Sequence, residues 1–152
     1  MTVHTIDNET IVAMWEATQG RFHEMVKQLQ DEQLSLAIGP ASIGHMIRHS
    51  AEVEYVYAQW VFGKEKPEGL EYHTLRGPGN SSVEFTSVDE LVELLTASSA
   101  VIVQCIKELP AESWLVEVKT PRGSFTPLDA ISQLLYHTGI HAGQISLMLK
   151  HA

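Results

Sequence analysis

Residues 126–145 read "TPLDAISQLLYHTGIHAGQI", and this stretch has the signals of an amphipathic helix. Thr126 is a suitable N-cap, Pro127 fits the first helical position, and Asp129 suits the positive end of a helix. Apolar or small side chains then recur every three or four residues, at Leu128, Ile131, Leu134, Leu135, Thr138, Ala142, Ile145 and Leu149. Two histidines, His137 and His141, lie four residues apart in this helix.

Three earlier segments show the same helical period, which indicates an all-α fold. Their apolar stripes run from Ile11 to Leu29, from Ile43 to Trp60 and from Leu91 to Leu109. Four amphipathic helices of roughly 20 residues, each with one apolar stripe, predict a four-helix bundle. The connector of residues 64–86 is long enough to run back along a helix, so the second and third helices can be parallel. Residues 114–125 alternate weakly and predict a small hairpin or an extended loop.

Composition narrows the class of protein. We expect one domain over residues 1–152, because this length suffices for a substantial core. A formal net charge of −9 with scattered basic residues argues against nucleic-acid and membrane partners. Cys105 is the single cysteine and lies on an apolar stripe, so we expect a small buried hydrophobe and no disulfide. Without a visible signal peptide or a spanning apolar run, the sequence predicts a cytoplasmic protein.

Histidines form two pairs at helical spacing. His45 and His49 lie in the second helix, and His137 and His141 in the fourth. Residues four apart on a helix point the same way, so each pair can share one metal ion, although such a pair is more often a polar helix edge. No glutamate follows the first histidine of the fourth-helix pair, so the zinc-protease motif is absent.

Position around each helix favours three of the four histidines. His141 lies nearest its apolar stripe and is expected to face the bundle interior, with His137 and His49 at the stripe borders and His45 toward water. His49, His137 and His141 are therefore the predicted metal ligands. Three neutral imidazoles with an open fourth position suit zinc, and nickel, iron or manganese can also be held. Glu52, Glu54 and Gln144 are within reach as acceptors for the second ring nitrogens.

The chain resembles the DinB-like (damage-inducible) family, related to the YfiT-like metal-dependent hydrolases. The resemblance rests on "SIGHMIRHSAEVEYVYAQW", followed much later by "TPLDAISQLLYHTGIHAGQI". The family pattern is one histidine on the second helix and His-x-x-x-His-x-Gly-Gln on the fourth. It matches His49, His137, His141, Gly143 and Gln144.

The resemblance implies a bundle with parallel second and third helices, a histidine triad for a divalent metal, commonly zinc or nickel, and a homodimer. Characterised relatives include enzymes that add a low-molecular-weight thiol to a small electrophile or use the thiol to isomerise a substrate. Many members carry an arginine before the Gly-Gln pair, where this chain has Ala142, and Ile140 also departs from the pattern. A substrate or subunit contact through that arginine therefore does not transfer to this chain.

Three interpretations follow from the sequence. The first is a metal-dependent enzyme, a thiol transferase or a hydrolase, with Arg48, Tyr55, Arg76 and Arg122 as candidate substrate contacts and no catalytic residue assigned. The second is a non-catalytic, stress-associated dimeric bundle with a structural or incidental metal. The third is a plain dimeric bundle without metal. An open site beside a pocket favours the first interpretation, and a closed four-ligand site favours the second.

Overall fold

The computed structural model describes residues 5–78 and 83–151, and in these ranges it contains four α-helices. The helices are α1 (Asn8–Lys27), α2 (Ile43–Phe62), α3 (Val88–Glu108) and α4 (Pro127–His151), with 3-10 helices at Asp31–Ser35 and Ala111–Ser113 and two strands, β1 (Val118–Thr120) and β2 (Gly123–Phe125). The predicted all-α four-helix bundle is confirmed, and β-structure within the described ranges is limited to one two-stranded sheet.

Each helix begins where the sequence offers a polar cap. Side chains at the four N-termini accept hydrogen bonds from backbone N–H groups of the first turn, at Asp7, Ser42, Ser87 and Thr126. These acceptors satisfy N–H groups that the helix itself leaves unbonded. At the other end of α2, Gly63 adopts a left-handed φ of 69°, which ends the helix and turns the chain.

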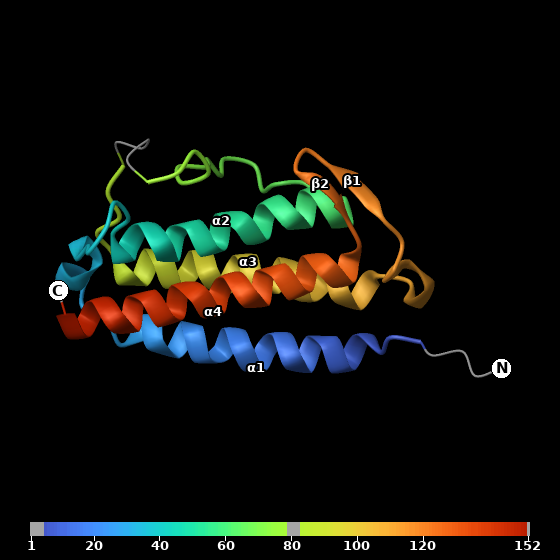
Figure 1. Ribbon diagram of the computed structural model, residues 1–152, viewed down its shortest axis with the longest axis horizontal. Helices are drawn as coiled ribbons and strands as arrows, with labels where there is room; N and C mark the ends of the chain where they lie inside the picture. Colours follow the sequence, from blue (N-terminus) through green and yellow to red (C-terminus); the bar gives the residue numbers. More distant parts are fainter. Residues whose placement is uncertain (1–4, 79–82, 152) are drawn as a thin grey trace.

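The helices α2 and α3 run parallel to each other, and α1 and α4 run in the opposite direction (Figure 1). At one end of the bundle, the Val88 N–H donates to the Asp31 carboxylate at 2.9 Å. At the other end, Lys64 after α2 pairs with Glu108 of α3 at 3.1 Å. Because both the starts and the ends of α2 and α3 lie together, the connector must return along the bundle, as its length predicts.

The core consists of two apolar clusters built from the predicted stripes. Representative buried members are Phe22, Ile47, Leu95 and Ile145 in one cluster and Trp15, Ala58, Ile102 and Leu134 in the other. Burying each large side chain stabilises the fold by roughly 1.5–3 kcal/mol. Buried polar groups pair across helices; for example, Gln19 Nε2 of α1 donates to Thr138 Oγ1 of α4 at 2.9 Å.

The connector between α2 and α3 lies against the outer side of α2 (Figure 1). Residues 79–82 of this connector lie outside the described ranges. Near its end, the Phe85 backbone approaches Gly44 so closely that a Cβ on Gly44 would lie 3.0 Å from the Phe85 carbonyl oxygen. Only glycine allows this approach without displacing the connector.

The segment between α3 and α4 forms the predicted hairpin. Strands β1 and β2 pair antiparallel, with Val118 opposite Phe125 and Thr120 opposite Gly123. The Phe125 ring meets the Tyr57 ring of α2 edge-on, with centroids 5.8 Å apart, so the hairpin is attached to the C-terminal half of α2. None of the helices in residues 5–78 and 83–151 has the length and apolar character needed to cross a membrane.

Candidate metal centre

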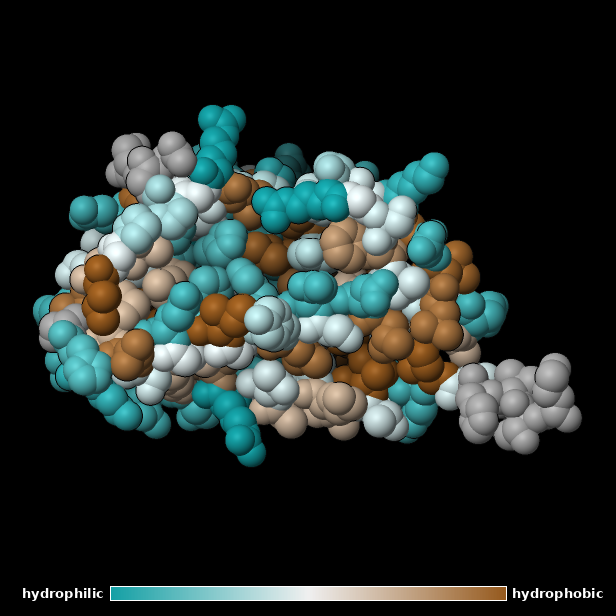
Figure 2. Space-filling view, viewed as in Figure 1, coloured by the Kyte–Doolittle hydropathy of each residue, from teal (hydrophilic) through white to brown (hydrophobic). Residues whose placement is uncertain are grey.

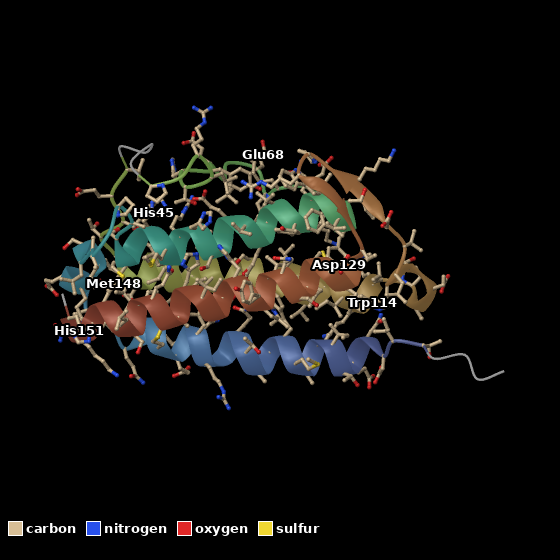
Figure 3. All side chains as sticks on the ribbon, in the orientation of Figure 1. His45, Glu68, Trp114, Asp129, Met148 and His151 are labelled. Atoms are coloured by element: carbon tan, nitrogen blue, oxygen red, sulfur yellow. The ribbon has the colours of Figure 1, made fainter. Side chains whose placement is uncertain are left out.

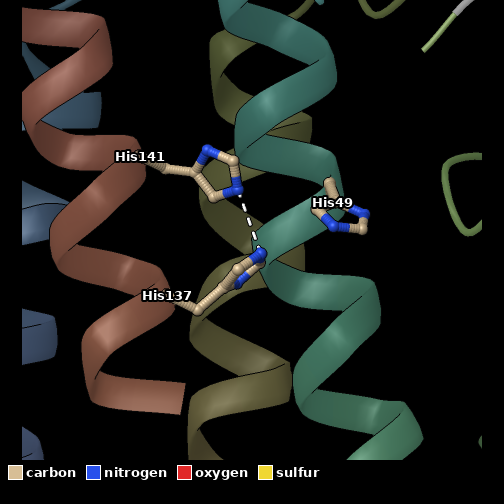
Figure 4. Close-up of side chains that lie close together, drawn as sticks. All are labelled: His49, His137 and His141. Carbon is tan, nitrogen blue, oxygen red and sulfur yellow. Dashed lines mark hydrogen bonds between the residues drawn. The ribbon is translucent and has the colours of Figure 1, made fainter. Parts of the chain in front are cut away.

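Three histidine side chains converge in the cleft between α2 and α4. His49 comes from α2, and His137 and His141 come from successive turns of α4 (Figure 4). One ring nitrogen of each residue lies within 4.8 Å of the corresponding nitrogens of the other two. The Nε2 atoms of His137 and His141 are 3.0 Å apart. The structure thus brings together the three histidines that the sequence selects.

A hydrogen-bonded relay from α2 fixes the orientation of the His49 ring. Thr74 Oγ1 donates to Glu52 Oε1 at 2.9 Å, because a carboxylate can only accept. The same Thr74 oxygen lies 3.1 Å from His49 Nδ1 and is left to accept from it. The proton of a neutral His49 therefore resides on Nδ1, and Nε2 presents a lone pair to the cleft.

Glu52 is fully buried and holds the connector against α2. Its Oε1 atom accepts from the backbone N–H groups of His73 and Thr74 at 2.8 and 3.0 Å. Its Oε2 atom accepts from Arg48 Nε at 2.6 Å. The carboxylate is thereby neutralised and saturated with donors, as a buried charge requires. Thr74 consequently reaches His49 from a connector whose position depends on Glu52.

Gln144 gives His141 the corresponding orientation. The amide oxygen of Gln144 lies 2.8 Å from His141 Nδ1 and accepts its proton, one turn along α4. The lone pair of His141 then also resides on Nε2, which faces His137 Nε2. Gln144 is thus one of the predicted acceptors, and Glu52 acts indirectly through Thr74.

Burial keeps the three imidazoles neutral. Desolvation is the largest effect, followed by repulsion from neighbouring imidazoles; together they lower the pKa of His49 to about 4 and that of His137 to about 3. Desolvation also lowers the pKa of His141, against a smaller opposing effect of its bond to Gln144. Neutral imidazole is the form that binds a metal ion, so the donor set fits a divalent cation.

The cluster opens onto a pocket of about 820 Å³ between α2, α4, the connector and the hairpin. In Figure 2, which views this face, apolar surface lies next to polar surface between the connector and α4. One wall is apolar and comes from α2, with Val53, Val56, Tyr57 and Trp60. Arg76 of the connector and Arg122 of the hairpin also line the pocket. Both are among the candidate substrate contacts that the sequence suggests.

Several sequence predictions about individual side chains are wrong. His45 does not face water: it projects on the connector side of α2 (Figure 3), is half-buried in the pocket, and its ring stacks on that of His49 at 6.1 Å. His141 does not face the bundle interior, since it is half-buried in the same cleft as His137 and His49. The connector lies along the outer side of α2 and lines the pocket together with α4, so side chains away from the core stripes are partly enclosed as well.

Three other residues that the sequence suggests for the site, Glu54, Arg48 and Tyr55, do not line the pocket. Glu54 points into the bundle, where its Oε2 accepts from Ser98 Oγ at 3.3 Å, so it is no acceptor for the histidines. Arg48 is bonded to Glu52 and to the Glu71 carbonyl oxygen at 2.7 Å and does not line the pocket. Tyr55 is buried outside the pocket lining. Cys105 is buried as predicted, and desolvation raises the pKa of its thiol to about 11.

The structure therefore defines a helical bundle with a three-histidine candidate metal site. A family model for the DinB superfamily matches residues 14–145, and the chain belongs to this family. The resemblance to the DinB-like family is thus confirmed. No curated protein sequence matches the chain.

Solved structures with a similar fold agree with this assignment. A DinB-like protein from Bacillus cereus matches with a TM-score of 0.73 and 17% identity, over 98% of this chain and 93% of that one. The mycothiol-dependent maleylpyruvate isomerase matches with a TM-score of 0.64 and 18% identity, over 94% of this chain. A histidine-to-alanine mutant of that isomerase matches with a TM-score of 0.61 and 16% identity, over 94% of this chain. This chain spans 63% of the isomerase, and the likeness to all three concerns the fold.

Proposed function

We propose that this protein is a metal-dependent enzyme that joins a low-molecular-weight thiol, or water, to a small electrophilic substrate. Its divalent metal is held by His49, His137 and His141. The observation that carries the proposal is the convergence of three ring nitrogens within 4.8 Å at the edge of a pocket of about 820 Å³. A pocket of this volume is in the range that encloses small organic ligands.

The chemistry of the donors supports zinc or nickel, with iron and manganese as further candidates. A divalent ion bound there would lower the pKa of a coordinated water or thiol and so provide a nucleophile at neutral pH. The protein's own contribution is orientation. Thr74 and Gln144 hold the His49 and His141 rings by their Nδ1 atoms, which leaves both Nε2 lone pairs directed at the cleft.

The thiol is the preferred nucleophile because of one structural relative. The isomerase of similar fold is described as mycothiol-dependent. Its likeness covers 94% of this chain, including both helices that carry the histidines. Hydrolysis is the second candidate reaction, since the same donor set serves water activation equally well.

The alternative of a non-catalytic bundle with a structural metal receives less support. Structural zinc sites are usually closed by four protein ligands. In residues 5–78 and 83–151, the group of possible ligands holds three histidines and neither a carboxylate nor a cysteine. A three-ligand cluster beside a pocket leaves room for a substrate, which favours the enzyme.

We further propose that the protein forms a homodimer through the outer face of α4. Tyr136 and Leu147 are 69% and 56% exposed, and Ile140 between them is 39% exposed. The three residues lie within about 40° of one another around the helix axis. An apolar face of this kind on a water-soluble bundle is typical of an interaction surface.

Metal analysis of protein purified without a histidine tag tests the site. We expect near-stoichiometric zinc or nickel in the wild type and its loss in His49→Ala and in His141→Ala, with helical circular dichroism unchanged. His45→Ala is the matched control, because His45 lines the same pocket outside the cluster. Wild-type protein that neither contains nor takes up metal would overturn the proposal. If metal binds, transfer of thiols to small electrophiles is assayed with the same variants.

A further inference from the structure

The charge of the pocket differs in sign from the charge of the chain. The sequence has 19 acidic and 10 basic residues. Among the described residues that line the pocket, however, the charged side chains are Arg76 and Arg122, and no aspartate or glutamate is present. The charged side chains of the lining are therefore basic on an otherwise acidic protein, and a basic side chain in a pocket favours an anionic ligand.

Arg122 is presented to the pocket by a well-defined turn. It occupies the tip of the hairpin between β1 and β2, before Gly123 with its φ of 114°. Thr120 closes the turn, since its Oγ1 donates to the Gly123 carbonyl at 2.7 Å and accepts from the Arg122 N–H at 3.2 Å. The turn thus sets where the Arg122 side chain begins.

Arg122 lies near the histidine cluster and has no ion pair with a carboxylate in residues 5–78 and 83–151. Arg122 and His49 line the same pocket, so the guanidinium and the histidine cluster face a common space. The buried carboxylate of Glu52 is already neutralised by Arg48 and by donors of the connector. Nothing described in the pocket balances the Arg122 charge.

The pocket wall contributed by α2 is apolar and aromatic. Tyr57 and Trp60 lie side by side with ring centroids 6.4 Å apart, and Val53 and Val56 extend the same surface toward His49. Apolar and aromatic walls with a few polar groups are typical of sites for small organic ligands. A ligand that fills this pocket therefore has an apolar body and an anionic group.

We propose that the pocket binds an organic carboxylate, with the carboxylate on Arg122 and the apolar body against Val53, Tyr57 and Trp60. This inference rests on the proposed function, because it names the substrate class of the same site. Guanidinium suits the planar carboxylate, to which it can donate two parallel hydrogen bonds.

Binding to metal-free protein tests this substrate class separately from the metal. The probes are 3-phenylpropionate and its neutral amide, which share the apolar body, and binding is followed by titration with NMR detection. We expect the carboxylate to bind at least about tenfold more tightly than the amide, as a charge-assisted bond implies. In Arg122→Gln this preference is lost.

Lys119→Gln is the matched control. It removes one positive charge from the same hairpin, but Lys119 is exposed and does not line the pocket. We expect it to keep the preference for the carboxylate. Equal binding of the two probes by the wild type, or equal losses in Arg122→Gln and Lys119→Gln, would overturn the proposal. Because no metal is present, failure of the metal site leaves this result unaffected.

The carboxylate can belong either to the thiol or to the electrophile. Two further probe pairs separate these sources: N-acetylcysteine with its amide, and cinnamate with cinnamamide. A preference for the acid that depends on Arg122 in either pair supports the proposal and identifies the source. The absence of an Arg122-dependent preference in both pairs would contradict it.

Discussion

Thr74 Oγ1 lies 3.1 Å from His49 Nδ1, so a connector residue orients a histidine of α2. Since Thr74 Oγ1 also donates to the buried Glu52 carboxylate, the direction of the His49–Thr74 bond is fixed. The arrangement links the candidate metal site to the connector. Any change that displaces the connector from α2 is therefore expected to reach the His49 ring.

Replacing Thr74 with valine tests this link. Thr74→Val keeps the volume but removes the acceptor for His49 Nδ1, and we expect zinc affinity to fall about 10- to 100-fold, as for other groups that orient metal ligands. Thr74→Ser retains the hydroxyl and is expected to bind zinc nearly as the wild type does. Competition with a chromogenic chelator measures both. Unchanged affinity in Thr74→Val would show that Thr74 has no orienting role.

Glu54 predicts a dependence of stability on pH. It is buried with one carboxylate oxygen unbonded, and desolvation raises its pKa well above 4.5. The folded state therefore keeps a proton that the unfolded state releases above about pH 4.5. The stabilising contribution is complete below that pH and is lost as the pH rises through the folded-state pKa.

Glu54→Gln mimics the protonated side chain, so it should remove this dependence. At pH 8 we expect the variant to be more stable than the wild type by about 1 kcal/mol or more, because no buried charge has to form. At pH 4.5 the two should be similar. Urea unfolding at both pH values measures the difference, with the exposed Glu93→Gln as control. A wild type that is as stable as Glu54→Gln at pH 8 contradicts the assignment.

The close packing of backbone around Gly44 limits the size of the side chain at this position. A Cβ at this position would lie 3.0 Å from the Phe85 carbonyl oxygen and 3.2 Å from that of Leu34. We expect Gly44→Ala to destabilise the protein by about 1–3 kcal/mol, as overpacking does. Gly20→Ala in α1 meets no atom within 4 Å and is expected to stabilise by roughly 0.5–1 kcal/mol. Thermal unfolding measures the stability of both variants. A change of the same sign in Gly44→Ala and Gly20→Ala would contradict this steric limit.

The parts of the fold and site that the sequence predicts are those governed by local periodicity. Apolar stripes fix which face of each helix is buried, and four-residue spacing places His137 and His141 on one side of α4. The antiparallel approach of α2 then adds His49. The same periodicity separates Glu52 from Glu54. Glu52 lies three residues after His49 and is therefore near it around the helix axis, whereas Glu54 lies five residues after His49 and is nearly on the opposite side.

The parts that the sequence does not predict come from segments without a period. Thr74 and the position of Arg122 depend on how a connector and a hairpin lie on α2, and no helical pattern specifies that. The helical position of His45 predicts exposure to water, because an apolar stripe shows only which side chains the bundle core buries. Leu70, Tyr72 and Leu75 signal that the connector packs against the bundle, but they do not show which histidine it covers.

The exposed face of α4 yields a prediction for the oligomeric state. If a second copy covers Tyr136 and Leu147, a charge in that face must be desolvated on association, so Leu147→Glu is expected to shift a dimer to monomer. Leu115→Glu is the matched control, because Leu115 is 68% exposed and lies outside α4. Light scattering coupled to size-exclusion chromatography at tens of micromolar protein distinguishes the two masses. A monomeric wild type, or a Leu147→Glu variant that stays dimeric, would show that the outer face of α4 is not a dimer interface.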